Sequence, residues 1–183
     1  MEEKFKNKFR IPSARLPCWD YGSNGLYYVT ICTKNRVHYF GNIGLNNNSE
    51  TQNLASLQQT PIGQIAYDNW SGIPNHFPFV QLDEFVVMPN HIHGILYIKR
   101  DDKFDWQMNK FGSQSRNLAS IIRGYKASVK TWATTNNIEF AWQPRYYDRV
   151  IRNEKEYTNV CEYLINNPGN WLSNGDNEDN LYP

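Results

Sequence analysis

The sequence lacks the features that define several large classes of protein. It has three cysteines, Cys18, Cys32 and Cys161, an odd number with no Cys-x-x-Cys spacing, which argues against a disulfide framework or a cysteine zinc site. No apolar run approaches the roughly 20 residues of a membrane span, and the first residues lack the apolar stretch of a signal peptide. We therefore expect a cytoplasmic protein with no membrane partner.

The chain also lacks a marked excess of charge of either sign. Its 19 basic and 18 acidic residues give a formal net charge of +1, so composition alone does not identify a nucleic-acid-binding protein. The segment 173–183 contains three acidic residues and no basic one, and we treat it as an acidic tail; without it the charge is +4. This modest bias is compatible with a local phosphate-binding face.

What is present is a pattern of strands and helices that fits one compact domain of 183 residues. We expect an irregular N-terminal arm at 1–25, the domain itself at 26–172 and the acidic tail after it. Aromatic and β-branched residues predict strands at 26–33, 80–88, 91–99 and 145–151. The polar segments 42–60 and 100–115 are expected to be loops.

Three helices complete the pattern. Pro61 suits the first turn of a helix, which the prolines at 74 and 78 should end, and apolar residues at helical spacing predict an amphipathic helix at 117–135. Asn153 should cap a last helix that runs to about Asn166, where Pro168 and Gly169 stop it. The order predicts an α+β fold, a ferredoxin-like four-stranded antiparallel sheet with two helices on one face.

His91 and His93 form the sharpest feature of the sequence. In a strand, residues i and i+2 point to the same side, so both imidazoles should share one face while Ile92 points into the other. Two neighbouring imidazoles are good ligands for a divalent metal, although ordinary polar strand residues can produce the same spacing. His38 and His76 have no such neighbour, and we interpret them as structural or surface residues.

The surroundings of the pair favour an open metal site. No set of cysteines or glutamates lies nearby to close a tetrahedral zinc site. A site that also accepts water and phosphate oxygens suits Mg²⁺ or Mn²⁺ better.

Tyr163 and Asn167 form a second pair, four residues apart and therefore on one face of the last helix. A phenol and a carboxamide oxygen there could both face a metal held by the sheet. Spacing alone does not select Tyr163, because the chain has twelve tyrosines and a helical tyrosine usually serves half-buried packing.

Taken together, these residues make the chain resemble the REP-associated tyrosine transposases, a branch of the single-tyrosine HUH transposases. The resemblance spans about residues 26–171 and rests on the segments 28–33, 86–94, 142–148, 151–154 and 163–168, which follow the family's order. It implies a ferredoxin-like fold in which a C-terminal helix carries the nucleophile, Tyr163. It also implies that His91, His93 and Asn167 bind Mg²⁺ or Mn²⁺, and it favours a monomer over a homodimer.

Other tyrosines compete for the role of nucleophile. Tyr125 falls on the apolar face of its helix, where packing explains it, and Tyr157 should point away from the direction of Tyr163. Tyr146 and Tyr147 remain open, because they and Trp142 could stack on unpaired bases or pack in the core.

The activity implied is the cutting and rejoining of single-stranded DNA at a REP-type hairpin. Tyr163 would attack as its phenol loses a proton, while the metal polarises the scissile phosphate; the products would be a 5′-phosphotyrosine and a free 3′-hydroxyl. Basic residues are the candidates for binding the DNA phosphates: Arg10, Arg15, Arg116, Arg123, Lys126, Lys130 and Arg145. For the four between 116 and 130, a solvated helix face is an equally good explanation.

Three alternatives stay open at this point. The fold could serve a relaxase or replication initiator, although such proteins usually carry a third histidine or an acidic ligand where this chain offers Asn167. It could bind DNA hairpins without cutting them. It could also be a metal phosphodiesterase in which Tyr163 is only structural.

Overall fold

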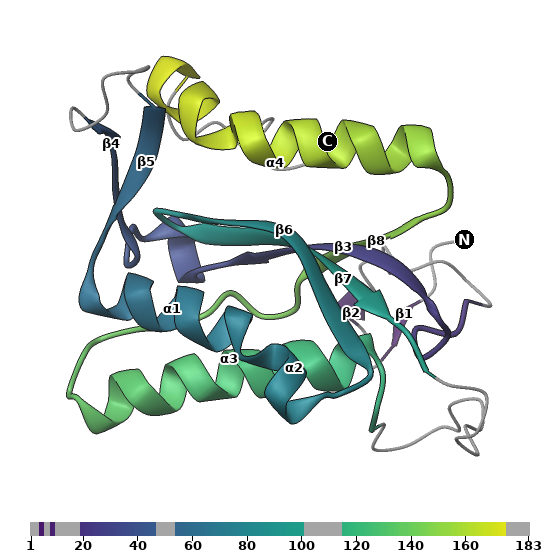
Figure 1. The fold of residues 1–183 in the computed structure, drawn as a ribbon. Coiled ribbons are helices and arrows are strands. Elements are labelled where there is room, and N and C mark those ends of the chain that lie inside the picture. Colours follow the sequence, from purple (N-terminus) through teal and green to yellow (C-terminus); the bar gives the residue numbers. More distant parts are fainter. Residues whose placement is uncertain (1–3, 6–7, 10–18, 47–53, 101–114, 175–183) are drawn as a thin grey trace.

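One four-stranded antiparallel sheet organises the chain (Figure 1). The computed structural model describes residues 4–5, 8–9, 19–46, 54–100 and 115–174. The sheet contains β3 (Gly25–Cys32), β6 (Val80–Met88), β7 (His91–Ile98) and β8 (Tyr147–Ile151) in the order β6-β7-β3-β8. Every neighbouring pair is antiparallel, so the predicted ferredoxin-like sheet is confirmed.

Two longer helices and one short helix cover one face of this sheet (Figure 1). They are α1 (Pro61–Ser71), α2 (Ile73–His76) and α3 (Leu118–Thr135). The main core lies beneath them and takes alternate residues of the central strands, among them Val29, Ile31, Ile92 and Leu96. Pro61 stands at the start of α1 as predicted, and Pro74, expected to end that helix, lies inside α2.

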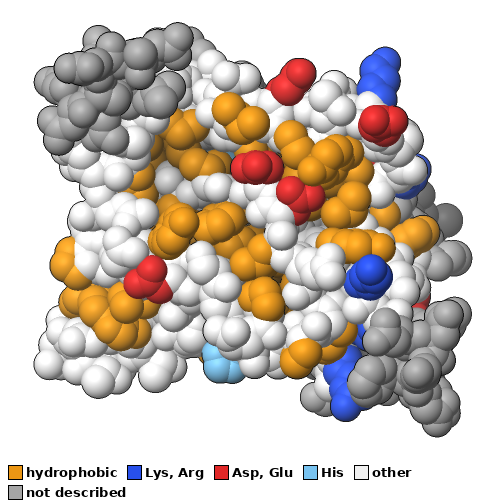
Figure 2. Space-filling view, viewed as in Figure 1, with side chains coloured by type: hydrophobic (Ala, Val, Ile, Leu, Met, Phe, Trp, Pro, Cys, Tyr) orange, Lys and Arg blue, Asp and Glu red, His pale blue; other side chains and the backbone are white. Residues whose placement is uncertain are grey.

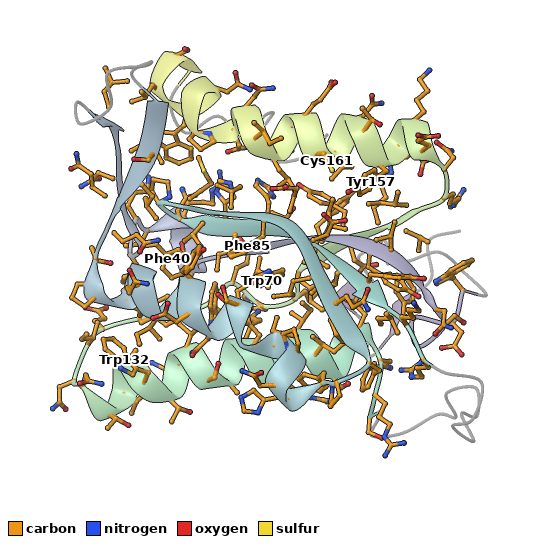
Figure 3. The ribbon with its side chains drawn as sticks, in the orientation of Figure 1. Phe40, Trp70, Phe85, Trp132, Tyr157 and Cys161 are labelled. Carbon is orange, nitrogen blue, oxygen red and sulfur yellow. The ribbon has the colours of Figure 1, made fainter. Side chains whose placement is uncertain are left out.

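The fourth helix, α4 (Glu154–Asn174), lies across the opposite face of the sheet (Figure 1). A second, smaller core joins it to the strands through Tyr28, Ile95 and Ile151 from the sheet and Val160 and Leu164 from the helix. Figure 3 shows side chains of α4, including the labelled Tyr157 and Cys161, between the helix and the sheet. Asn153 caps the helix as predicted, because its side chain accepts a hydrogen bond from the Glu156 amide at 2.9 Å.

The predicted end of this helix is wrong. Pro168 and Gly169 were expected to stop it near Asn166, yet α4 continues to Asn174 with Pro168 inside. A proline within a helix removes one backbone hydrogen bond and costs about 3 kcal/mol. Tertiary packing compensates, because the last turns contact the β4–β5 hairpin and place Trp171 against the rings of His38 and His91.

The segment 42–60, predicted to be a polar loop, is largely a hairpin. It forms β4 (Gly41–Asn46) and β5 (Leu54–Gln59), paired antiparallel; residues 47–53 lie outside the described residues. The polar composition of the segment did not predict strands. They form because β4 and β5 pair with each other. The hairpin stands at one end of the sheet and contacts α4 (Figure 1).

The ends of the chain differ from the predictions in smaller ways. The arm 1–25, expected to be irregular, contains two short paired strands, β1 (Lys4–Phe5) and β2 (Lys8–Phe9). The predicted acidic tail overlaps the last two residues of α4, and the rest of it lies outside the described residues, as does nearly all of the predicted loop 100–115. None of the helices that the structure describes combines the length and apolar character of a membrane span.

Gly94, directly after the histidine pair, allows α1 to approach strand β7. A Cβ atom at this position would lie 2.4 Å from the Trp70 ring and 3.0 Å from the Phe85 side chain, and Trp70 is fully buried. The close approach of the indole to the backbone therefore requires a residue without a side chain.

We predict that Gly94→Ala lowers the free energy of unfolding by about 1–3 kcal/mol, because a rigid, buried indole must shift. Chemical denaturation measures this change. Gly169→Ala is the matched control: its Cβ would meet nothing within 4 Å, so alanine should leave the stability of α4 unchanged or raise it. A Gly94→Ala protein as stable as the wild type would contradict the packing argument.

Candidate active site

The two histidines of β7 lie on the face of the sheet that α4 covers. Their ring centroids are 4.4 Å apart, and His93 contacts Tyr163 of α4, whereas Ile92 between them packs in the main core. The sequence prediction that both rings share one face is therefore confirmed. Both side chains are nearly inaccessible, with exposed fractions of 2% for His91 and 0% for His93.

Asn90 fixes the orientation of the His91 ring. The Asn90 amide nitrogen donates to the carbonyl of Arg36 at 3.2 Å, so its oxygen is the atom that faces His91 Nδ1 at 2.6 Å. His91 Nδ1 then carries the proton and donates it, which leaves a lone pair on Nε2. That Nε2 atom is buried and has no hydrogen-bond partner among the described residues.

Two hydroxyls hold the His93 ring from the neighbouring strand. Its Nδ1 lies 2.8 Å from the Tyr28 hydroxyl and 2.9 Å from Thr30 Oγ1. Thr30 donates its own proton to the Tyr28 oxygen at 3.1 Å, so the Thr30 oxygen can accept from Nδ1. In that tautomer Nε2 of His93 keeps its lone pair and faces the Tyr163 hydroxyl at 3.3 Å.

Burial keeps both histidines neutral. It lowers the pKa of His91 well below its usual value, with smaller contributions from His93, Arg36 and His38. It lowers the pKa of His93 to about 3, and the positive charge of Arg36 adds to the effect. Neutral imidazoles with available lone pairs are the form that binds metal ions.

Tyr163 is brought to the histidines by the second core of α4. Its ring centroid lies 5.3 Å from that of His93 and 6.5 Å from that of Tyr28. Val160 and Leu164, on the same side of the helix, pack against the sheet, so the hydroxyl is held over the histidine face while the residue stays partly exposed.

The competing tyrosines serve other contacts. Tyr125 is buried and donates to the carbonyl of Ala66 at 2.9 Å, and Tyr157 donates to Asp83 at 2.9 Å. Tyr147 packs edge-on against Tyr28, and Tyr146 packs against the main core. The Tyr28 hydroxyl lies 2.8 Å from a ring nitrogen of His93, against 3.3 Å for the Tyr163 hydroxyl, but Tyr28 is 0% exposed and burial raises its pKa far above 10.

Asn167 lies one helical turn beyond Tyr163 and is buried, with 5% of its surface exposed. The site therefore brings His91, His93 and Tyr163 into contact, and Asn167 follows on the same helical face.

The basic residues of the α3 region are only partly open to a ligand. Lys126 donates to the carbonyls of Gln143 and Arg145 at 2.7 and 2.9 Å, and Lys130 donates to that of Phe140 at 2.7 Å. Both lysines thus hold the segment 140–145 against the helix, and burial lowers the pKa of Lys126. Trp142, in that segment, packs in the main core.

The remaining DNA-binding candidates are exposed or lie outside the described residues. Arg116, Arg123 and Arg145 are exposed, and Arg116 and Arg145 adopt left-handed backbone conformations, with φ of 61° and 67°. Arg10 and Arg15 lie outside the described residues.

Sequence patterns did not single out four residues that surround the histidines. Tyr28 and Thr30 were parts of a strand, and their role follows from the pairing of β3 with β7, in which Thr30 lies opposite His93. Arg36 lies in the short turn Lys34–Arg36. Trp171 lies in the part of α4 beyond its predicted end. His38, expected to be a structural or surface residue, is exposed, and its ring contacts Trp171, which contacts His91.

Comparisons with known proteins show what the chain as a whole is similar to. The chain is 38% identical over 180 residues to an uncharacterized protein of Haemophilus influenzae, covering 93% of this chain and 92% of that protein. It is 22% identical over 151 residues to a second Haemophilus influenzae protein, provisionally named a REP-associated tyrosine transposase, covering 81% of this chain and 73% of the relative. No family model matches the chain.

A further sequence relative and a solved structure are also similar to the chain. The chain is 28% identical over 91 residues to the REP-associated tyrosine transposase of Escherichia coli, covering 50% of this chain and 45% of that protein. Its fold matches a REP-associated tyrosine transposase solved with a REP hairpin, with a TM-score of 0.53 and 17% identity over 94% of this chain and 89% of the other.

The buried histidines predict that mild acid destabilises the metal-free protein. An unfolded histidine has a pKa near 6.5, so below this pH the unfolded chain binds protons that the folded chain does not. As the pH falls from 7.5 to 5.5, the free energy of unfolding should therefore decrease, by up to about 1.4 kcal/mol per buried histidine for each pH unit below 6.5.

Urea denaturation in the presence of a chelator measures this dependence. The double variant His91→Asn, His93→Asn should show a flatter dependence on pH. His76→Asn, which changes an exposed ring, should keep the wild-type slope. If the double variant lost stability as steeply as the wild type, the histidines would not be the cause.

Proposed function

We propose that the chain is a REP-associated tyrosine transposase, as its similarity to proteins of that name supports, and that it cuts single-stranded DNA beside a hairpin and rejoins it through a covalent link to Tyr163. The observation that carries this proposal is the contact of the Tyr163 hydroxyl with Nε2 of His93 at 3.3 Å. Among the described tyrosines that contact His93, Tyr163 is the one that is partly exposed. Its hydroxyl lies against a ring suited to metal binding.

The residues present fit a divalent metal ion. His91 offers a buried Nε2 atom without a hydrogen-bond partner among the described residues, oriented by its bond to Asn90. His93 and the amide oxygen of Asn167 would complete the protein ligands, and all three are neutral groups. A bound Mg²⁺ or Mn²⁺ would polarise the scissile phosphate and lower the energy of the charge that develops there.

The covalent step conserves the phosphodiester bond energy. The Tyr163 hydroxyl oxygen forms a bond to phosphorus as the bond from phosphorus to the 3′-oxygen breaks. The phenolic proton passes to solvent and the departing 3′-oxygen takes one from water, so the products are a 5′-phosphotyrosine and a 3′-hydroxyl. Attack by a second 3′-hydroxyl reverses these changes and releases Tyr163, with no energy source required.

His93 positions the phenol and is too weak a base to remove its proton. A phenol has a pKa near 10, whereas burial lowers the pKa of His93 to about 3. Transfer of the proton between them would cost on the order of 10 kcal/mol. The hydrogen bond from Tyr163 to Nε2 instead holds the hydroxyl at the site until DNA and metal are bound.

The distribution of charge limits where the DNA can lie. Figure 2 shows hydrophobic side chains gathered below α4 and around the edge of β6, with few Lys and Arg side chains on this side of the molecule. Binding of phosphates there would gain little electrostatic energy. We therefore place the hairpin on other surfaces, where the exposed Arg116, Arg123 and Arg145 could contact phosphates.

A covalent adduct tests the nucleophile. Incubation with a labelled single-stranded hairpin oligonucleotide and Mn²⁺ should yield a protein–DNA adduct that survives denaturation, and Tyr163→Phe should abolish it by removing the only atom that bonds to phosphorus. Tyr157→Phe is the matched control, since it removes a phenol from the same helix that points to Asp83; it should retain the adduct.

The other outcomes of the adduct experiment would indicate a different activity or a different nucleophile. Cleavage without an adduct would indicate a phosphodiesterase, and tight hairpin binding without cleavage would indicate a binding protein. An undiminished adduct in Tyr163→Phe would place the nucleophile elsewhere.

Metal binding can be measured apart from catalysis. We expect His91→Ala to abolish Mn²⁺ binding, measured by the electron paramagnetic resonance of free Mn²⁺, and Asn90→Ala to weaken it roughly 10–100-fold by releasing the His91 ring. Asn90→Asp keeps an acceptor for Nδ1 and should restore much of the affinity, while His76→Ala should bind as the wild type does. Equal affinity in His91→Ala and wild type would refute the proposed ligand set.

A further inference from the structure

Arg36 lies in a strained turn that follows strand β3. Asn35 and Arg36 both adopt left-handed backbone conformations, with φ of 54° and 57°, in the short helical turn Lys34–Arg36. Such conformations cost residues with a side chain about 1 kcal/mol or more each. Two in succession reverse the chain tightly after Thr33 and return the Arg36 side chain toward the sheet.

The guanidinium of Arg36 lies on the histidine face. Its Nη1 atom is 3.7 Å from Cys32 Sγ, and Cys32 is paired with His91 across β3 and β7. Residues directly opposite in an antiparallel pair point to the same side of the sheet, so the Cys32 side chain and the guanidinium beside it flank the His91 ring. The same positive charge contributes to lowering the pKa of both His91 and His93.

Hydrogen bonds also fix the turn to His91. The Asn90 side chain connects them, because its amide nitrogen donates to the Arg36 carbonyl and its oxygen accepts from His91. Thr33 adds a bond from its amide to the Asn90 carbonyl at 2.9 Å, and its hydroxyl proton is shared between that carbonyl, at 3.0 Å, and the Val37 carbonyl, at 2.8 Å. The position of Arg36 relative to His91 is therefore set by a continuous hydrogen-bonded unit.

This arrangement concentrates positive charge beside neutral ligands. The candidate ligands His91, His93 and Asn167 carry no charge, so a divalent ion would keep its full charge and Arg36 would add another. Such a site is complementary to an anion, and the planar guanidinium matches the oxygens of a phosphate.

We propose that Arg36 is a further catalytic residue, which binds a non-bridging oxygen of the scissile phosphate from the side of His91. This proposal rests on the function proposed for Tyr163. As the Tyr163 oxygen approaches, negative charge on the phosphate oxygens increases, and a fixed guanidinium stabilises that charge more than it stabilises the ground state. Arg36 exchanges no proton and forms no covalent bond.

The test compares Arg36→Gln and Arg36→Lys with the wild type. Both variants keep a non-glycine residue at the left-handed position and the carbonyl that Asn90 contacts. Arg152→Gln is the matched control, because it removes a charge from an exposed residue next to Ile151, which pairs with Leu26 at the far end of β3 from Cys32.

The first readout is the single-turnover rate of adduct formation on the hairpin oligonucleotide. Arg36→Gln should lower this rate by about 10²–10³-fold, as loss of one donor to a developing oxyanion does. Arg36→Lys should recover part of it, and Arg152→Gln should stay within about two-fold of the wild type. Mn²⁺ affinity should change by less than about three-fold in all of them, because none of these residues is a ligand.

The second readout is the binding of inorganic phosphate to the Mn²⁺-loaded protein, followed by the broadening of its ³¹P resonance. Arg36→Gln should weaken this binding at least about ten-fold, and a purely structural role in the turn would not have this effect without also weakening Mn²⁺ binding. Unchanged rate and unchanged phosphate affinity in Arg36→Gln would overturn the proposal, as would a loss of Mn²⁺ binding that explains the lower rate.

The two proposals can fail separately. If the wild type forms no adduct, the function proposed for Tyr163 is refuted, and with it the catalytic role of Arg36. In that case the phosphate measurement tests only whether Arg36 forms part of an anion site. Equal phosphate affinity in the wild type and Arg36→Gln, or no binding in either, would overturn that site as well.

Discussion

Strand β7 is buried on both faces, and the rest of the structure depends on that constraint. Its alternate residues have to satisfy two different layers: Ile92, Leu96 and Ile98 fill the main core, while His91, His93 and Ile95 face α4. A shift of one residue in the pairing with β3 would exchange these sets and bury both imidazoles among the aliphatic side chains of the main core. The register that builds the hydrophobic core is thus the register that builds the site.

Helix α4 illustrates how tertiary contacts override a local signal. Pro168 disfavours the helix at that position, yet the turns beyond it bring Trp171 to His38 and His91 and rest on the β4–β5 hairpin. The N-terminal half is held by Val160, Leu164 and the bond from Tyr157 to Asp83. Tyr163 lies between these two attachments, so its hydroxyl is fixed by the helix as a whole.

The sheet, its helices and the placement of the histidine pair follow from the sequence, because alternation with a period of two and capping residues such as Asn153 are local signals. The hairpin 41–59 does not, since polar residues form strands there only through pairing with each other. Tyr28 and Thr30 could not be assigned to His93 without the cross-strand register. Arg36 was missed for a related reason: its direction depends on two left-handed residues that are not glycines. Lys126 and Lys130 have contacts that the sequence did not indicate, because their amines bind backbone carbonyls that no sequence pattern reveals.

The partners of the two histidines have a consequence for how tightly an ion would be held. His93 is supported by the hydroxyls of Tyr28 and Thr30, and His91 by the amide of Asn90; none of these carries a negative charge. A carboxylate in their place would make the imidazoles more basic and stronger electron donors. Rings supported by neutral oxygens would therefore bind an ion more weakly. The occupancy of such a site would follow the concentration of free divalent cations. That concentration would then set the fraction of molecules that hold an ion at a given moment.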